Sequence, residues 1–183
     1  MIRCATQIID RNGGESRREA ELRATRKCLE VLGIDRMPTH TDSGAPILPG
    51  VAVSVSHSER IACVAISSEA GHSFGIDVED STRAQLAKVA PRFLSGHELT
   101  LLDFDSENLC KAWTAKEAVF KAIDKEGVDF AKDIRLSLPN FDTAEYIPEN
   151  SLFSLSFYNM PFNNIICIAQ LCNNSQTVTL FNS

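Results

Sequence analysis

Two short apolar runs, RIACVAI and NIICIAQ, lie about a hundred residues apart and constrain the fold more than any other feature of the sequence. Both resemble buried strands. The first follows Val51–Ser56 across His57–Glu59, and the second follows Ser151–Phe157 across Asn159–Pro161. Each is therefore predicted to be the second strand of a hairpin.

Each hairpin is preceded by a predicted helix and followed by a further predicted strand. The helices are Glu15–Leu32, with Ser16 as its cap and Gly33 as its stop, and Asn108–Ile123; the strands are Phe74–Val78 and Thr177–Phe181. A short helix is also predicted to open at Ser95–Glu98. The repeated order predicts an α+β fold of two similar halves, about 1–72 and about 73–183, packed about a pseudo-twofold axis with the active site in the cleft between them. The alternative is that any α+β chain contains similar short apolar strands.

Composition and charge exclude several classes of protein. The 183 residues are enough for one domain with a sizeable core, and 44% hydrophobic and 23% charged residues are typical of a soluble globular protein. No apolar run approaches the roughly 20 residues that span a bilayer, and the start MIRCATQIIDRNGG lacks the apolar core of a signal peptide. We therefore expect a cytoplasmic protein that does not enter a membrane. The net charge of −6 argues against a general nucleic-acid binder.

The six cysteines form no Cys-x-x-Cys pair, and Cys63 and Cys167 lie inside the apolar runs. We expect buried, reduced thiols rather than disulfides. The same spacing, with four scattered histidines, argues against a zinc site.

Three carboxylates crowd the stretch GIDVED, residues 75–80, at the end of a predicted strand. Because side chains alternate along a strand, Asp77 and Glu79 share one face, with Cα atoms roughly 6.5 to 7 Å apart. Two carboxylates at that spacing suit a hard cation such as Mg²⁺, which takes oxygen ligands. A solvated strand end with no metal is the alternative.

The predicted helix over 108–123 carries Trp113, Glu117 and Lys121 on one face, at i, i+4 and i+8. Glu117 offers a third carboxylate. A surface ion pair between Glu117 and Lys121 would also explain the spacing, and the tryptophan has a core position as its alternative.

His57 lies between Ser56 and Ser58 at the predicted hairpin turn. An imidazole there can donate to a phosphate oxygen, although an ordinary turn residue is the simpler interpretation. A serine nucleophile is poorly supported, because adjacent residues of a strand point to opposite faces.

Four motifs in this order, SVSHS, GIDVED, FLSGHE and LCKAWTAKEAVFKAI, resemble the 4′-phosphopantetheinyl transferases, specifically the larger surfactin-type branch. The resemblance covers residues from about 44 to 127. It implies Mg²⁺-dependent transfer of the phosphopantetheine arm from coenzyme A to a serine of an apo acyl or peptidyl carrier protein, with release of 3′,5′-ADP.

The resemblance also implies roles for individual residues. Asp77, Glu79 and Glu117 would bind Mg²⁺; Glu117 would be the general base, with Lys116 a weaker candidate for a base or phosphate role. Lys121 would hold a pyrophosphate oxygen, and the Ser56–His57 pair would contact another phosphate. Near the first helix, Arg17 and Arg18 are candidates for the adenosine 3′-phosphate, against the alternative of a solvated helix face.

Three departures from the family pattern support a second hypothesis. Gly44-Ala45-Pro46 replaces the usual Gly-Lys-Pro, the glycine-rich pattern after the long helix becomes KAIDKEG, and strands that often precede the first helix are expected to be shortened or absent. A degenerate relative that binds coenzyme A or a carrier protein without transfer is therefore the alternative. Because a duplication supplies both halves within one chain, we expect a monomer. The sequence does not distinguish fatty-acid, polyketide and nonribosomal-peptide carriers.

Overall fold

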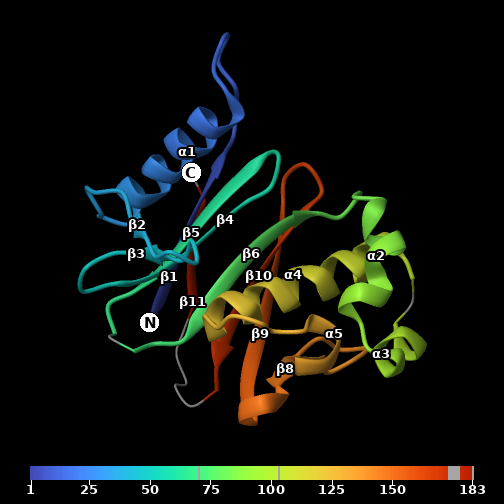
Figure 1. The fold of residues 1–183 in the computed structure, drawn as a ribbon. Helices are drawn as coiled ribbons and strands as arrows, with labels where there is room; N and C mark the ends of the chain where they lie inside the picture. Colours follow the sequence, from blue (N-terminus) through green and yellow to red (C-terminus); the bar gives the residue numbers. More distant parts are fainter. Residues whose placement is uncertain (70, 103, 173–177, 183) are drawn as a thin grey trace. The chain divides into compact units, whose positions relative to one another are not determined.

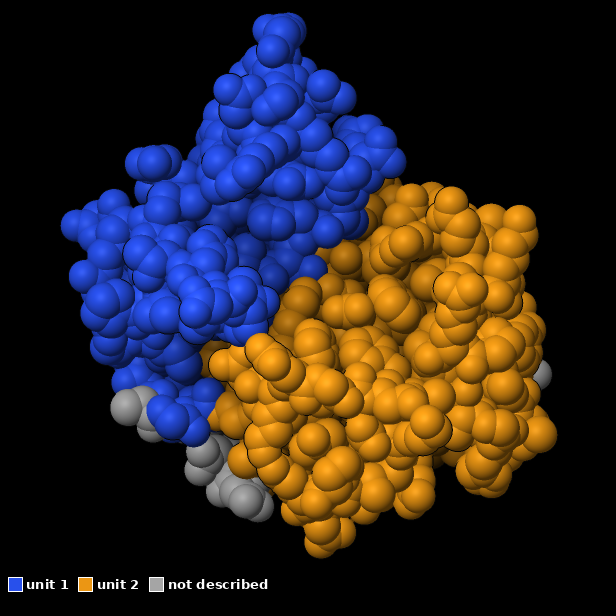
Figure 2. Space-filling view, viewed as in Figure 1, with its two compact units in different colours: residues 1–72, 175–183 blue, residues 73–174 orange. Residues whose placement is uncertain are grey.

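The chain divides into two compact units in the computed structural model, which describes residues 1–69, 71–102, 104–172 and 178–182. Unit 1 comprises Met1–His72 and Ser175–Ser183, and unit 2 comprises Ser73–Asn174 (Figure 2). Each unit has its own cluster of buried apolar side chains, and the architecture is mixed α+β.

Unit 1 contains a four-stranded sheet in the order β11-β1-β5-β4 and the helix α1 (Figure 1). The elements are β1 (Ile2–Ile8), α1 (Arg17–Val31), β2 (Thr39–His40), β3 (Pro46–Ile47), β4 (Ala52–His57), β5 (Ile61–Ser67) and β11 (Val178–Asn182). The short pair β2–β3 forms a separate two-stranded sheet. The helix packs against β1 and β5.

The ends of α1 follow from its sequence. Ser16 and Glu19 form a reciprocal capping box at the start. Gly33, just after the helix, adopts a positive φ, which glycine tolerates without strain and which ends the helix. The buried side chains recur at helical spacing, Ala20, Ala24, Cys28 among them, so a single stripe faces the sheet.

Unit 2 contains a five-stranded sheet in the order β6-β10-β9-β8-β7. The elements are β6 (Phe74–Asp80), α2 (Gln85–Phe93), α3 (Gly96–Leu101), α4 (Ser106–Ile123), α5 (Phe130–Asp133), β7 (Ile134–Leu136), β8 (Thr143–Tyr146), a 3₁₀ turn (Ile147–Glu149), β9 (Ser151–Met160) and β10 (Asn164–Leu171). The long helix α4 lies against β6 and β10 (Figure 1).

The two units share part of their order of elements, although further elements lie between the shared ones in each unit. In each, a strand is followed by a helix and a hairpin, and the strand pairs antiparallel with the second hairpin strand: β1 with β5, and β6 with β10. The repeated order is thus strand, helix, strand pair. The repeat predicted from the sequence begins at the helix, because β1 gives no alternating signal.

The strand β1 shows that a strand does precede the first helix, so the expectation that such strands are absent is wrong, while the expected shortening stays a prediction. It pairs with β5 on one side and with β11, in parallel, on the other. Its burial does not alternate, because three consecutive residues, Cys4, Ala5 and Thr6, are buried. A strand without alternation gives little periodic signal.

Other predictions are confirmed with small shifts. Both hairpins form, the second with its turn after Met160, and the short helix α3 begins beside its predicted cap Ser95. The last strand begins at Val178, and Thr177 lies outside the described residues. The helix α2 and the strands β7 and β8 were not predicted.

The cysteines are free thiols, and five of them are buried as expected; Cys172 is exposed. Among the helices of the described residues, none is long and apolar enough to cross a membrane.

Candidate active site

Gly75 allows α4 to lie unusually close to β6. A Cβ atom at this position would be 2.0 Å from the carbonyl oxygen of Ala118 and 2.8 Å from the amide nitrogen of Ala122. Only a residue without a side chain fits there. Since strand side chains alternate, the face that meets α4 at Gly75 also carries Asp77 and Glu79.

Hydrogen bonds fix the direction of α4 along β6. Near one end Ser73 Oγ donates to the carbonyl oxygen of Ala122 at 2.7 Å, and toward the other Cys110 Sγ lies 3.8 Å from the carbonyl oxygen of Glu79. The helix therefore runs antiparallel to the strand. Glu117, between Cys110 and Lys121 in the helix, lies along the acidic part of β6.

Asp77 and Lys121 form an ion pair between these two elements. Lys121 Nζ lies 2.7 Å from Asp77 Oδ1 and also donates to the carbonyl oxygen of Ile76 at 3.2 Å. The side chain of Asp77 is 9% exposed and that of Lys121 27%. The ammonium thus partly compensates a carboxylate that burial would otherwise disfavour.

Glu79 is paired with Arg83, four residues further along the chain. The glutamate side chain is 14% exposed, and the arginine side chain, 44% exposed, reaches it from the solvent side. Arg83 was not singled out in the sequence. The sequence signal for this ion pair was the position of Arg83, four residues after Glu79 in the loop that follows β6.

Glu117 has its pKa raised to about 7, first because it is buried and next because Asp77 lies near, with a smaller contribution from Glu79; Lys121 and Arg83 act in the opposite direction. The negative charge of these carboxylates also acts on the thiols of Cys110 and Cys167. The pKa of Cys110 is raised to about 12, first by burial and also by nearby carboxylates, Glu79 and Asp77 among them. These shifts identify a concentration of negative charge at the junction of β6 and α4.

The donor chemistry of Asp77, Glu79 and Glu117 fits a hard divalent cation, since all three offer carboxylate oxygens and two of them raise the pKa of the third. A cation bound among them would relieve this repulsion. As the side chains stand, no group of three or more His, Cys, Asp or Glu residues within the described part of the chain converges on a common point. Two of the three carboxylates instead contact Lys121 and Arg83.

Lys116 does not face this cluster. Its side chain is 0% exposed, and Nζ lies 2.8 Å from Glu98 Oε2 while donating to the carbonyl oxygens of Phe130 and Ile134. Burial lowers the pKa of the lysine, although Glu98 acts in the opposite direction. The base or phosphate role considered for Lys116 is therefore wrong, because all three ammonium hydrogens have protein acceptors.

Glu98, from the FLSGHE stretch, is the other member of this buried pair. Its Oε1 accepts from the amide of Leu136 at 2.9 Å, and its Oε2 accepts from the amide of Ser95 at 2.7 Å. The pair thereby ties α3 and β7 to α4, the helix that carries Glu117.

Trp113 packs in the core of unit 2, as the alternative interpretation held. Its ring centroid lies 5.1 Å from that of Phe93, edge to face, and 5.9 Å from that of Phe130. The aromatic contacts hold α2 and α5 against α4.

The remaining predicted site residues belong to unit 1. Thr25 Oγ1 of α1 lies 2.6 Å from Nε2 of His57, which is half-buried at the end of β4. Ser56 beside it is buried.

Arg17 and Arg18 are exposed at the start of α1, and Arg17 forms an ion pair with Glu21 at 2.7 Å. The structure thus brings Asp77, Glu79, Glu117 and Lys121 together within unit 2. The four unit 1 residues stay predictions as site residues.

Comparison with known proteins covers this same part of the chain. No curated protein matches. Residues 73–162, which include β6, α4 and all four clustered residues, match the 4′-phosphopantetheinyl transferase superfamily.

Proposed function

We propose that the protein is a Mg²⁺-dependent 4′-phosphopantetheinyl transferase of the surfactin type, which moves the arm of coenzyme A to a serine hydroxyl of an apo acyl or peptidyl carrier protein and releases 3′,5′-ADP. The observation that carries the proposal is the cluster of three carboxylates and Lys121 at the junction of β6 and α4, inside residues 73–162 that match the superfamily.

Asp77, Glu79 and Glu117 are the proposed metal ligands. A bound Mg²⁺ would neutralise the carboxylates and stabilise negative charge on the pyrophosphate oxygens in the transition state. Without a cation the same carboxylates would repel coenzyme A.

Lys121 and Glu117 carry the proposed chemistry of the chain itself. Lys121 already holds a carboxylate oxygen at 2.7 Å, and its partly exposed ammonium can exchange that partner for a phosphate oxygen. Glu117 is the proposed general base for the attacking serine hydroxyl, because a carboxylate on this face of α4 needs only hydrogen-bond reach to the incoming group.

The resemblance assigns further contacts with coenzyme A to residues of unit 1. His57 and Ser56 would meet a phosphate of the pyrophosphate, and Arg17 and Arg18 the adenosine 3′-phosphate. The shared order of strand, helix and hairpin supports the further proposal of an internal duplication.

The proposal is tested by intact-mass measurement of a panel of apo carrier proteins incubated with the protein, coenzyme A and Mg²⁺. We expect a gain of one phosphopantetheine that EDTA abolishes. Glu117→Gln should lower the rate by at least about a hundredfold, whereas Glu107→Gln, which changes an exposed acid of the same helix, should leave it unchanged. Equal rates for the two variants would contradict the assignment.

A degenerate protein that binds coenzyme A without transfer is the second candidate, favoured by Ala45 in the loop between β2 and β3. A basic side chain there would supply one more charge-assisted contact with phosphate. Binding of coenzyme A with no mass gain on any carrier would favour this candidate, and Ala45→Lys would then be expected to strengthen that binding.

A further inference from the structure

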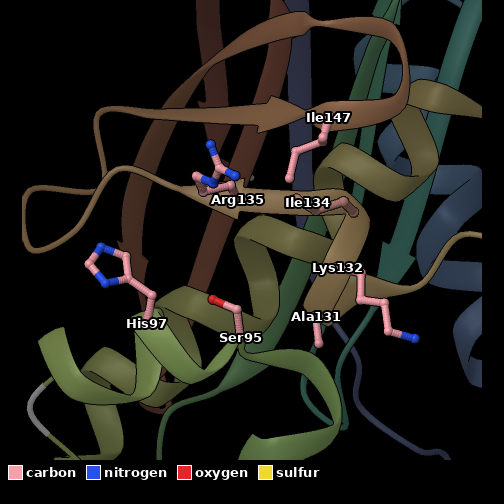
Figure 3. Close-up of a pocket in the computed structure, with 7 residues that line it drawn as sticks. All are labelled: Ser95, His97, Ala131, Lys132, Ile134, Arg135 and Ile147. Atoms are coloured by element: carbon pink, nitrogen blue, oxygen red, sulfur yellow. The ribbon is translucent and has the colours of Figure 1, made fainter.

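A pocket of about 490 Å³ opens in unit 2 (Figure 3), and the residues that line it do not include the clustered carboxylates. Ser95 and His97 line it from the start of α3, and Lys132, Ile134 and Arg135 line it from α5 and β7; Ile147 completes the wall. Every ionisable side chain in this lining is a cation or an imidazole. The remaining lining is largely aliphatic.

The buried Lys116–Glu98 pair holds two walls of this pocket in place. Glu98 accepts the amide of Ser95, and Lys116 donates to the carbonyl oxygen of Ile134. Both members of the pair are at most 2% exposed. Because the walls are anchored to α4 by these bonds, the pocket is preformed and needs little ordering when a ligand enters.

Arg135 can exchange its present partner, whereas Lys132 is held by Asp129 at 2.8 Å. Arg135 contacts Glu145 through one guanidinium nitrogen at 3.3 Å, and its side chain is 60% exposed. Exposed ion pairs of this kind contribute little to stability, so a ligand carboxylate can compete with Glu145. A guanidinium has five N–H donors in a planar fork that matches a carboxylate.

The geometry points to a binding site for a small amphipathic carboxylate. We propose that Arg135 receives the carboxylate, with His97 and the hydroxyl of Ser95 beside it, and that the carbon chain lies on Ala131 and Ile147. Neither the metal cluster nor the transfer reaction takes part in this binding.

Octanoate is the probe for this site, with acetate and octan-1-ol as controls that keep only the charge or only the chain. Each is titrated into the ¹⁵N-labelled full chain without coenzyme A, metal or carrier protein. We expect octanoate to shift the amides of residues 95–98 and 132–135 and to bind at least about tenfold more tightly than either control.

Arg135→Ala should weaken octanoate by at least about tenfold, while Lys88→Ala, an exposed cation of α2 outside the pocket, should bind as the wild type does. The amide spectrum of each variant reports whether its fold is kept. Equal binding of octan-1-ol, shifts spread over unit 2, or an unchanged affinity in Arg135→Ala would overturn the proposal. Because no transfer is measured, failure here leaves the proposed transferase activity untouched.

Discussion

Replacing Gly75 by alanine tests whether the approach of α4 to β6 builds the acidic cluster. The new Cβ would be 2.0 Å from the carbonyl oxygen of Ala118, 2.8 Å from the amide nitrogen of Ala122 and 2.9 Å from Lys121 Cβ. Two of these atoms belong to the helix backbone. A rotamer change cannot remove them, so the helix and the strand must separate.

The size of that separation sets the expected cost. Ordinary van der Waals contacts begin at 3.4 Å. A Cβ atom 2.0 Å from the Ala118 oxygen therefore requires the helix and the strand to move apart by more than an ångström. Overpacking a core typically costs about 1 to 3 kcal/mol, and a clash with helix backbone belongs at the upper end. We expect Gly75→Ala to lower the free energy of unfolding of unit 2 by about 3 kcal/mol. The same movement would pull Lys121 away from Asp77, now 2.7 Å apart, so phosphopantetheine transfer should fall as well.

Urea unfolding followed by Trp113 fluorescence measures this effect in unit 2, because the chain has one tryptophan and it lies in that core. Gly96→Ala is the matched control, since a Cβ there meets nothing within 4 Å and the backbone needs no positive φ. Its stability should be unchanged or slightly higher. If Gly75→Ala unfolds within about 0.5 kcal/mol of the wild type, the close approach does not constrain the two elements as described.

Three further predictions concern stability. Lys116→Met should lower the free energy of unfolding by about 3 to 5 kcal/mol in tryptophan-monitored unfolding, because it leaves the buried Glu98 carboxylate without its cation. Adding Glu98→Gln should recover part of that loss, and an equal or larger loss in the double variant would contradict the reasoning. Asp105→Ala removes the side-chain cap of α4 and should cost about 1 kcal/mol in the same assay, whereas no change would mean that the cap is dispensable. Burial lowers the pKa of His72 from 6.5, so the unfolded chain binds the proton more readily and unit 1 should lose stability as the pH falls below about 6.5. Amide exchange in β5 should therefore be faster at about pH 5.5 than at about pH 7.5, after correction for intrinsic rates, and this difference should be smaller in His72→Asn.

The parts of the fold that the sequence predicted are those with a local signal. The Ser16 cap, the strand over GIDVED and the hairpin turns depend on neighbouring residues, and all are present in the structure. The strand β1 was missed because its stability comes from pairing with residues far away in the chain. The short strands β7 and β8 pair with neighbours in the sequence and were missed because three or four residues carry little periodic signal.

The sequence likewise predicted only part of the candidate site. Alternation placed Asp77 and Glu79 on one face, and helical spacing placed Glu117 and Lys121 on another, but neither pattern states that Gly75 brings those faces together. The role considered for Lys116 was wrong, although the sequence places Lys116 one helical turn after Ala112. It therefore lies on the buried, apolar face of α4. A charged residue inside such a stripe requires a buried partner, which Glu98 supplies through the fold of unit 2.

The parallel pairing of β1 with β11 has a consequence for synthesis on the ribosome. Unit 2 is one continuous segment, so it can fold as soon as it emerges, whereas β1 must wait for a partner translated about 170 residues later. At about 5 to 20 residues per second this delay is roughly 9 to 35 s. During that time one edge of β1 stays open to other chains, and ribosome-associated chaperones or a slow codon pattern before β11 would act on this interval.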